Sequence, residues 1–397
     1  MGHVPTLFAS FFYFDMSFMV WVLLGPLGVQ IAKDLGLSPA QKGLMVAVPV
    51  LSGALLRIVA GIMVDRLRPK LTGIILQVIV ILSLLTAWSI GVNSFEGVLA
   101  VGLALGVAGA SFAVALPLAS QWYPPEHQGT ALGIAGAGNS GTVFAALFAP
   151  MLAVAFGWNS VFGLATIPLA VALVVFVLLA RNSDKAPAPQ KFGDYMRVLK
   201  TGDAWWFMFL YAVTFGGFVG LSSSLTIYFN DQYGLSPVVA GYFTAACVFA
   251  GSMVRPIGGA FADRVGGVFS LSIMFAVAAC ALGLISLGVW SAPMALLIFV
   301  VAMLALGMGN GAVFQLVPQR FSREIGVLTG LIGMAGGVGG FYLASSLGIA
   351  KQLTGSYHPG FLVFAMLAAG ALVALTGLKS RWRRTWGSSS EIGSARI

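Results

Sequence analysis

Charged residues are scarce in this chain: lysine, arginine, aspartate and glutamate make up only 8% of its 397 residues. A soluble protein of this length covers its surface with far more charge, so the composition excludes a water-soluble globular protein. Hydrophobic residues account for 59% of the chain instead. We therefore expect an integral membrane protein whose outer side chains mostly contact the lipid bilayer.

Cysteine and histidine are also scarce, with two and three residues. Cys247 and Cys280 both fall inside apolar runs, where they are expected to act as small core residues, so we expect neither a disulfide framework nor a metal site. The apolar runs contain no cluster of acids, bases, nucleophiles or metal ligands. We therefore expect no enzyme activity and no cofactor.

Long apolar runs are what the sequence has in abundance. About 20 apolar residues cross a bilayer as a helix, and the chain contains twelve runs of that length. They are too long and too rich in glycine for barrel strands, which are about 10 residues long and alternate strictly. The spans that we expect are 7–31, 40–64, 71–91, 97–121, 128–155, 159–180, 204–229, 236–262, 267–290, 292–318, 325–350 and 359–378.

The positive charges of the chain are concentrated in one set of loops, and the net charge is +9. An even number of spans places both termini on one side of the membrane. The basic residues expected on that side are Arg66, Arg68, Lys70, those of 181–200, Arg264, Arg320, Arg323, Lys379, Arg381, Arg383 and Arg384. The other side has only Lys33, Lys42 and Lys351. Because basic loops stay in the cytoplasm, we expect a multi-pass protein of the inner (cytoplasmic) membrane with both termini cytoplasmic, and no nucleic-acid partner.

A polar, proline-containing segment divides the chain into two halves. We expect an N-terminal six-helix bundle at 1–180, a cytoplasmic linker at 181–203, a C-terminal six-helix bundle at 204–380 and a cytoplasmic tail at 381–397.

The second span of each half carries the same five residues in the same order. The first copy is Gly53, Arg57, Gly61, Asp65 and Arg66, and the second is Gly251, Arg255, Gly259, Asp263 and Arg264. Every residue of the second copy follows its counterpart by 198 positions. Two six-helix halves related by such a repeat resemble the transporters of the major facilitator superfamily. We expect an all-α membrane protein with the major facilitator fold, in which twelve transmembrane helices form two pseudo-symmetric six-helix halves.

The end of each repeat resembles the cytoplasmic loop signature of that superfamily. The resemblance implies that these residues latch the helices together at the cytoplasmic face during alternating access. The alternative is a helix end that merely carries charges. The residues implied in the latch are Gly61, Asp65, Arg66, Gly259, Asp263 and Arg264.

Arg57 and Arg255 carry the functional argument, because each lies eight residues before the aspartate that closes its span. That separation is about 12 Å along a helix, which reaches the middle of a bilayer core about 30 Å thick. An arginine there costs roughly 3 kcal/mol, so it is expected to face an internal cavity or a partner. Of the twelve acidic residues, only Asp15 is deep within a span. The surplus of buried positive charge favours an anionic substrate, and pairing with carbonyls and Asp15 is the structural alternative.

The presence of arginine and not lysine at both positions also indicates the kind of anion that binds. The guanidinium is planar and offers parallel N–H donors, which match a planar oxyanion better than the point charge of an ammonium group. Two arginines at equivalent depth, one from each half, would hold one small anion between the halves.

Glycine is abundant, with 51 residues, and it concentrates at 133–141 in the fifth span and at 330–341 in the eleventh. Glycine-rich helices usually indicate close packing, which leaves Asn139 in the fifth span unexplained. Combined with the two arginines, these stretches resemble the nitrate/nitrite porter family, which carries a glycine-rich signature in each of the two helices. The likeness covers nearly the whole chain and includes 14–21 in the first span.

This resemblance implies a set of substrate-binding residues. Arg57 and Arg255 would hold the anion, and Asn139 would donate an N–H to one of its oxygens. The aromatic walls of the site would be Phe112, Tyr211 and Phe215. Each of these rings would otherwise be interpreted as core or lipid-facing. The signature residues implied in the same site are Gly138, Ser140, Gly336 and Gly337, and the last two would act through backbone approach alone.

The resemblance also implies a function, which is secondary active transport of nitrate or nitrite, or both, by a monomer working through alternating access. Either nitrate/nitrite antiport or proton-coupled nitrate symport would fit. Asp15 is the candidate for proton coupling because it is the sole carboxylate within a span, and a structural hydrogen bond is its alternative role. The rival functions are transport of another small anion, such as formate, oxalate or chlorate, and a non-transporting anion sensor.

Overall fold

The structure is a computed structural model that describes residues 2–123, 125–184, 192–321 and 325–386. The predicted tail beyond Trp386 and the loop residue Arg323 lie outside the described residues. The helices are α1 (Val4–Trp21), α2 (Leu24–Leu35), α3 (Pro39–Leu67), α4 (Pro69–Ile90), α5 (Phe95–Gly109), α6 (Phe112–Ser120), α7 (Pro125–Gly136), the 3-10 helix η1 (Ala137–Ser140), α8 (Gly141–Phe156), α9 (Trp158–Leu179), α10 (Phe192–Leu199), α11 (Gly202–Tyr233), α12 (Pro237–Met253), α13 (Arg255–Val265), α14 (Gly267–Ile285), α15 (Ala292–Arg320), α16 (Ile325–Thr354) and α17 (His358–Trp386).

The described part of the chain contains 12 helical spans that are long and apolar enough to cross a membrane, which confirms the predicted number. Most of their bounds agree with the predicted ranges to within a few residues. The ninth span is shorter than predicted, because α14 ends at Ile285 rather than at 290. Gly288, just beyond it, has a φ of 69°, a left-handed conformation that favours glycine and breaks the helix.

Four of the spans consist of more than one helix. They are formed by α1 with α2, α5 with α6, α7 with η1 and α8, and α12 with α13. In the eighth span the break falls at Val254, two residues before Pro256. Proline has no N–H to donate and its ring crowds the preceding turn, so the helix stops and starts again. As a result, Arg255 becomes the first residue of α13.

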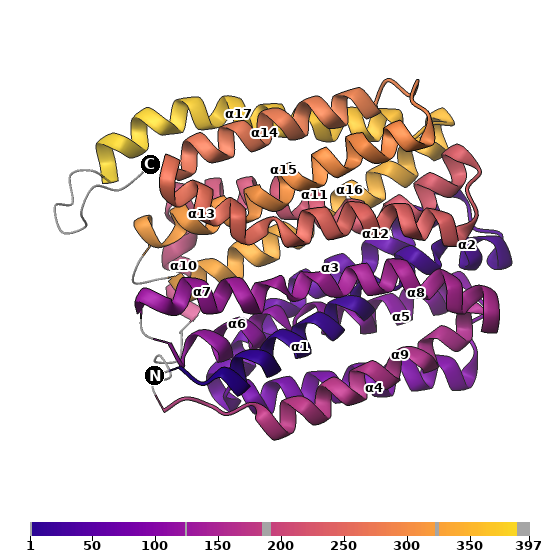
Figure 1. Ribbon diagram of the computed structural model, residues 1–397, viewed down its shortest axis with the longest axis horizontal. Coiled ribbons are helices and arrows are strands. Elements are labelled where there is room, and N and C mark those ends of the chain that lie inside the picture. The colour runs from indigo at the N-terminus through magenta and orange to yellow at the C-terminus, as the bar shows by residue number, and fades with distance from the viewer. Residues whose placement is uncertain (1, 124, 185–191, 322–324, 387–397) are drawn as a thin grey trace.

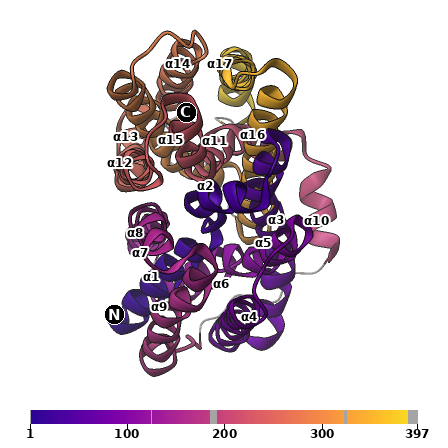
Figure 2. The same cartoon turned by 90° about the vertical axis from the view of Figure 1, so that its right-hand side faces the viewer.

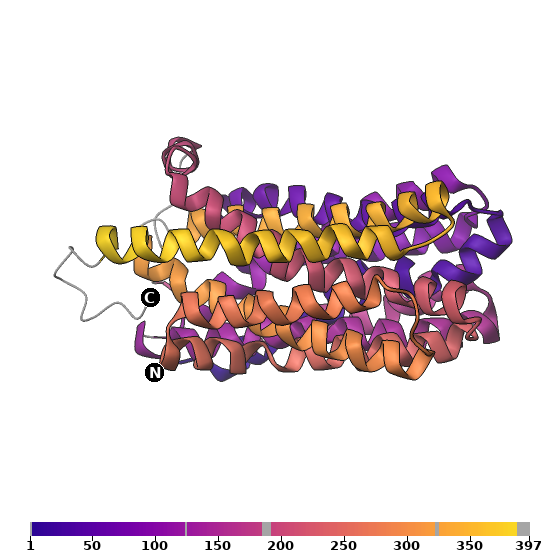
Figure 3. The same cartoon turned by 90° about the horizontal axis from the view of Figure 1, so that it is seen from above.

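The spans form two bundles that lie side by side. Figure 2 views the molecule along the helices, with α1–α9 in one bundle and α11–α17 in the other. The short helix α10, in the predicted linker, lies outside both bundles, and Figure 3 shows it projecting from one face. The predicted border at 180/181 lies just after α9, whereas those at 203/204 and 380/381 fall inside helices, since α11 already begins at Gly202 and α17 continues to Trp386.

The start of α1 and the end of α17 lie at the same end of the bundle, where α10 is also found (Figure 1). We call this the terminal end and the opposite one the far end. At the far end the two halves are in contact: Lys42 of α3 forms an ion pair of 2.9 Å with Asp231 of α11. The backbone of Gly43 also packs against Gly348 of α16.

The halves diverge toward the terminal end, as the separation of α7 and α13 in Figure 1 shows. Gly133 and Gly136 of α7 and Gly330 of α16 have no neighbouring atom within 4 Å of the place where a Cβ would lie. These three glycines therefore face open space. The two arginines of the repeat lie between this open region and the closed far end.

Candidate functional site

Arg57 is buried inside the bundle, with only 2% of its surface exposed. Its Nε donates a hydrogen bond of 3.2 Å to the carbonyl of Gly109, and its Nη1 donates one of 2.6 Å to the carbonyl of Gly333. Gly109 is the last residue of α5, and at the break that follows, the N–H of Ala113 bonds to Ala110 instead. The broken fourth span thus leaves a carbonyl for Arg57, and α16 of the other half supplies the second acceptor.

Three aromatic rings surround the Arg57 guanidinium. Its Cζ lies 4.9 Å from the ring centre of Phe112, 5.2 Å from that of Phe215 and 5.3 Å from that of Trp21. Contacts of this kind stabilise a cation through the negative faces of the rings. Trp21 can approach because Gly53 has no side chain, since a Cβ there would lie 2.6 Å from the indole nitrogen. The first glycine of the repeat is therefore explained by packing of the site.

Arg255 lies in the other half and is half-buried. Its Nη2 donates a hydrogen bond of 3.3 Å to the hydroxyl oxygen of Tyr211, and its Cζ lies 5.9 Å from the ring centre of Phe314. Tyr211 stacks on Phe215, with ring centres 5.1 Å apart and ring planes within 4° of parallel. Phe215 contacts Arg57 in turn. The stacked pair therefore links the two arginines of the repeat.

Neither arginine takes part in an ion pair within the described residues. The carbonyl pairing that was the structural alternative is partly present at Arg57, but carbonyls carry no net charge. The Nη2 of Arg57 and the Nη1 of Arg255 are buried and have no hydrogen-bond partner. A buried and a half-buried arginine, each with a buried donor nitrogen that lacks a partner, form a site that an anion would satisfy.

The fifth span changes from an α-helix to the 3-10 helix η1 at the glycine-rich signature. Asn139 in η1 is 1% exposed, and its Oδ1 has no hydrogen-bond partner. The carbonyl of Asn139 accepts a hydrogen bond of 3.5 Å from Ser252, which lies three residues before Arg255. η1 therefore packs against the C-terminal half close to Arg255, and it brings a buried amide with it.

The neighbours of Asn139 contact α1. Gly138 packs so closely on α1 that a Cβ would lie 3.0 Å from the backbone nitrogen of Asp15. Ser140 donates a hydrogen bond of 2.7 Å to the carboxylate of Asp15, which is only 3% exposed. Ser140 is thus a partner of Asp15, and Gly138 allows the two helices to approach.

The two signature glycines of α16 each make room for a different neighbour. A Cβ on Gly336 would lie 2.8 Å from the rings of both Tyr211 and Phe215. A Cβ on Gly337 would lie too close to Ala54 of α3 in the other half. Gly336 therefore permits the stacked aromatic pair, and Gly337 permits close contact between the halves.

The residues that the resemblance implies in the latch lie at the ends of α3 and α13. Arg66 and Arg264 are exposed there. Tyr195 of α10 lies next to the first copy, because its hydroxyl is 3.9 Å from the Cβ position of Gly61. Burial, together with the charge of Asp65, raises the pKa of Tyr195. The Tyr195 side chain of the linker helix therefore reaches the last turns of α3.

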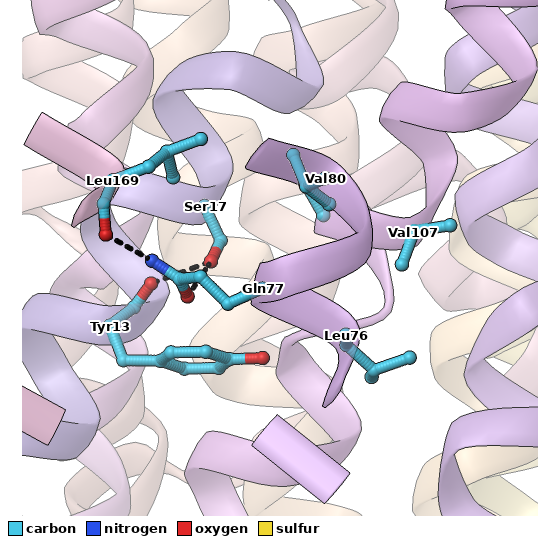
Figure 4. Close-up of a pocket in the computed structure, with 8 residues that line it drawn as sticks. Tyr13, Ser17, Leu76, Gln77, Val80, Val107 and Leu169 are labelled. Atoms are coloured by element: carbon cyan, nitrogen blue, oxygen red, sulfur yellow. Dashed lines mark hydrogen bonds between the residues drawn. The ribbon is translucent and has the colours of Figure 1, made fainter. Parts of the chain in front are cut away.

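A second group of buried polar side chains lies inside the N-terminal half, in a small pocket (Figure 4). Gln77 donates a hydrogen bond of 2.9 Å to the carbonyl of Leu169 and accepts one of 3.5 Å from Ser17. Ser17 also donates to the carbonyl of Tyr13 at 2.7 Å. These groups satisfy one another within one half, so we interpret the pocket as structural.

Several residues of the site were not among those predicted. Trp21 and Phe314 contact the arginines. Both lie in stretches that resemble the porter family, Trp21 at the end of 14–21, but the resemblance was not used to assign either ring to the site. The carbonyls of Gly109 and Gly333 have no sequence signal at all, because every residue carries a carbonyl. Only the helix break and the packing of α16 reveal them.

A bundle of twelve spans in two repeated halves, with buried basic groups between them, defines a secondary transporter. Residues 6–344 match the family model described as Major Facilitator Superfamily. The chain belongs to this superfamily and, within it, to the nitrate/nitrite porter family.

Two relatives and one solved structure illustrate the similarity. The chain is 33% identical to a "Nitrite extrusion protein" of Bacillus subtilis over 362 residues, which cover 90% of each chain. It is 30% identical to a "Probable nitrate/nitrite antiporter NarK1" of Thermus thermophilus, covering 91% of this chain and 88% of the relative. The crystal structure of a bacterial homologue of the human lysosomal transporter Spinster has the same fold, with a TM-score of 0.67 and 18% identity over 94% of this chain and 96% of that one.

Proposed function

We propose that this protein carries nitrate and nitrite across the membrane by alternating access and binds the anion between Arg57 and Arg255. The observation that carries the proposal is that neither guanidinium group has an ion pair within the described residues, and each has one buried nitrogen without a hydrogen-bond partner. The names of the relatives supply the identity of the anion. A rigid aromatic pair connects the two arginines and favours a small, planar ligand.

The anion would complete the coordination of both arginines. Arg57 is fixed by its two carbonyl partners, so its free Nη2 has a defined direction. Arg255 is held less firmly, by one hydrogen bond of 3.3 Å. A planar oxyanion accepts from both guanidinium groups and from the Asn139 amide, and it neutralises charge that otherwise repels across the interface. Binding would thus favour approach of the two halves.

Two modes of coupling are consistent with this site. Moving one negative charge into a negative interior costs about 2.3 kcal/mol per 100 mV. Exchange of nitrate for nitrite moves no net charge and needs no titrating group, and one of the relatives is named an antiporter. Symport with protons needs a carboxylate such as Asp15, which accepts a hydrogen bond from Ser140 beside the predicted asparagine.

The topology belongs to the same proposal. Because the basic loops gather at the terminal end, this end would face the cytoplasm, and the protein would be a monomer in the inner (cytoplasmic) membrane. The two bundles, joined by 181–203 and followed by a tail from 381, would act as the two rocking bodies. The latch residues would hold the cytoplasmic ends together in the opposite state, and the protein would have no enzyme activity.

The decisive experiment uses purified protein in lipid vesicles with the internal anion and the pH gradient varied independently. We expect labelled nitrate to enter protein-containing vesicles that are loaded with nitrate or nitrite. It should not enter vesicles of the same lipid composition that lack the protein. Formate, oxalate and chlorate are competitors in the same assay. If one of these anions shows counterflow and nitrate does not, that anion is the substrate instead of nitrate. If the protein binds an anion but shows no counterflow, it is a sensor and not a transporter.

A further inference from the structure

Trp21 is the last residue of α1 and lies at the break of the first span, before α2 begins at Leu24. Its side chain is completely buried. The indole Nε1 donates a hydrogen bond of 2.7 Å to the carbonyl of Pro49 in α3. Pro49 lies about two turns before Arg57 on the same helix. The indole is thus anchored to the helix that carries the first arginine of the repeat.

Three further residues enclose the same indole. A Cβ on Gly53 of α3 would lie 2.6 Å from its Nε1, and a Cβ on Gly109 of α5 would come closer still. The ring of Phe18 meets the indole edge to face, with ring centres 4.7 Å apart. Because α1, α3 and α5 all pack on it at close range, the indole is held in one position.

Trp21 differs from the other aromatic and carbonyl partners of Arg57 in how it is fixed. The acceptor Gly333 and the ring of Phe215 belong to the C-terminal half. Alternating access moves the two halves against each other, so these two contacts depend on the state of the transporter. Trp21 and Phe112 move together with Arg57, and of these two rings only the indole has an N–H that anchors it.

The place beside the repeat glycine is taken by a phenylalanine in the C-terminal half. Gly251 corresponds to Gly53, and a Cβ on Gly251 would lie 2.9 Å from the ring of Phe218. Phenylalanine has no N–H, so this ring cannot be bonded to the repeat helix. Arg255 of the same half is half-buried and donates a hydrogen bond of 3.3 Å. The half that contains the anchored indole therefore also contains the more firmly held arginine.

We propose that Trp21 is a positioning residue for substrate binding, which holds the Arg57 guanidinium so that its unpartnered Nη2 stays available to the anion. This inference rests on the proposed function and deepens it. The ring lies 5.3 Å from the Arg57 Cζ and carries no charge, so it orients the cation without neutralising it. A group that is already fixed loses less freedom when the ligand binds. Trp21 thus strengthens binding of the anion although it does not contact it.

The test is Trp21→Phe, which places the side chain of the C-terminal half beside the first repeat. This change removes the N–H and reduces the ring. We expect the nitrate concentration that gives half-maximal counterflow to rise about 10-fold, which is about 1.4 kcal/mol. The maximal rate should change less than about threefold, because saturating nitrate restores the position of Arg57.

The matched control is Trp158→Phe. Trp158 is also buried in the N-terminal half, its indole donates a hydrogen bond of 2.7 Å to Asp34 of α2, and Phe162 meets it edge to face. This variant loses the same groups, and its half-saturation by nitrate should stay at the original value. If Trp21→Phe shifts half-saturation no more than Trp158→Phe, or lowers the maximal rate alone, Trp21 is only structural and the inference is wrong.

A double variant tests whether Trp21 acts through Arg57. Lysine at position 57 lacks the planar fork that the indole orients. Trp21→Phe added to Arg57→Lys should therefore weaken nitrate-dependent protection against thermal unfolding by less than about twofold beyond Arg57→Lys alone. Two effects that multiply in full would show that Trp21 acts independently of Arg57, which contradicts the inference.

If Trp21→Phe does not fold, a fluorinated tryptophan inserted at position 21 alone keeps the shape and the N–H and weakens the negative face of the ring. It should raise half-saturation by nitrate at least about twofold, and an unchanged value would overturn the inference. If the unaltered protein exchanges neither nitrate nor nitrite, the proposed function is wrong and the inference falls with it. If it exchanges nitrate and the two tryptophan variants behave alike, only the inference is wrong.

Discussion

Nη1 of Arg57 donates a hydrogen bond of 2.6 Å to the carbonyl of Gly333, which lies in the opposite half of the molecule. A buried charge in one bundle is thus bonded to the backbone of the other. Since alternating access moves the two halves against each other, this bond would be a contact that depends on the state of the transporter. The bond is next to the place proposed for the anion. Arg57 would therefore both bind the substrate and connect the two halves.

The first prediction concerns the geometry of the arginine pair. Arg57→Lys and Arg255→Lys keep the charge and remove the planar fork. Since each loses at least one charge-assisted hydrogen bond, we expect nitrate counterflow to fall about 100-fold in either variant. Arg197→Lys, on exposed α10, is the matched control and should transport normally. Wild-type rates in both lysine variants would contradict the proposed site.

The second prediction separates the two modes of coupling. Asp15→Asn removes the charge and keeps the size of the side chain that Ser140 contacts. If Asp15 carries the proton, uptake driven by a pH gradient is abolished while nitrate/nitrite counterflow in the same vesicles persists. If the Asp15→Asn variant still takes up nitrate in response to a pH gradient at the wild-type rate, Asp15 does not carry the proton.

The third prediction concerns the signature glycines of α16. Gly336→Ala places a methyl group against Tyr211 and Phe215, and we expect overpacking to cost about 1–3 kcal/mol and to lower transport. Gly330→Ala, in the same helix, faces open space. This control should be neutral, or stabilising by up to about 1 kcal/mol because alanine favours helix. Thermal unfolding in detergent and counterflow measure both effects, and equal behaviour of the two variants would refute the packing role.

The fourth prediction concerns the far end, where Lys42 and Asp231 join the halves at 2.9 Å. Tyr357 also donates a hydrogen bond of 2.7 Å to this carboxylate. Because both side chains are largely buried, we expect Lys42→Asp to open the far end by repulsion and to reduce counterflow. The exchange Lys42→Asp with Asp231→Lys should restore transport at least partly. If Lys42→Asp alone transports normally, the Lys42–Asp231 pair does not control closure of the far end.

The sequence predicted the architecture well because membrane insertion depends on local composition. Each span is a run of apolar residues whose backbone groups must form their hydrogen bonds within one helix. Its presence can therefore be predicted without knowledge of the neighbouring helices. The two halves followed from the repeat around Arg57 and Arg255. The breaks at Ala110 and Val254 were not predicted, although they decide which carbonyl and which helix terminus face the site.

The sequence by itself determined that twelve apolar helices occur in two related halves and that two arginines lie deep within them, because hydropathy and repetition are properties of the linear chain. Only the tertiary structure decided that Gly109 and Gly333 hold Arg57 and that Tyr211 and Phe215 connect it to Arg255. The partners of a buried charge depend on which distant helices pack beside it. That choice is made by close packing between elements far apart in the chain.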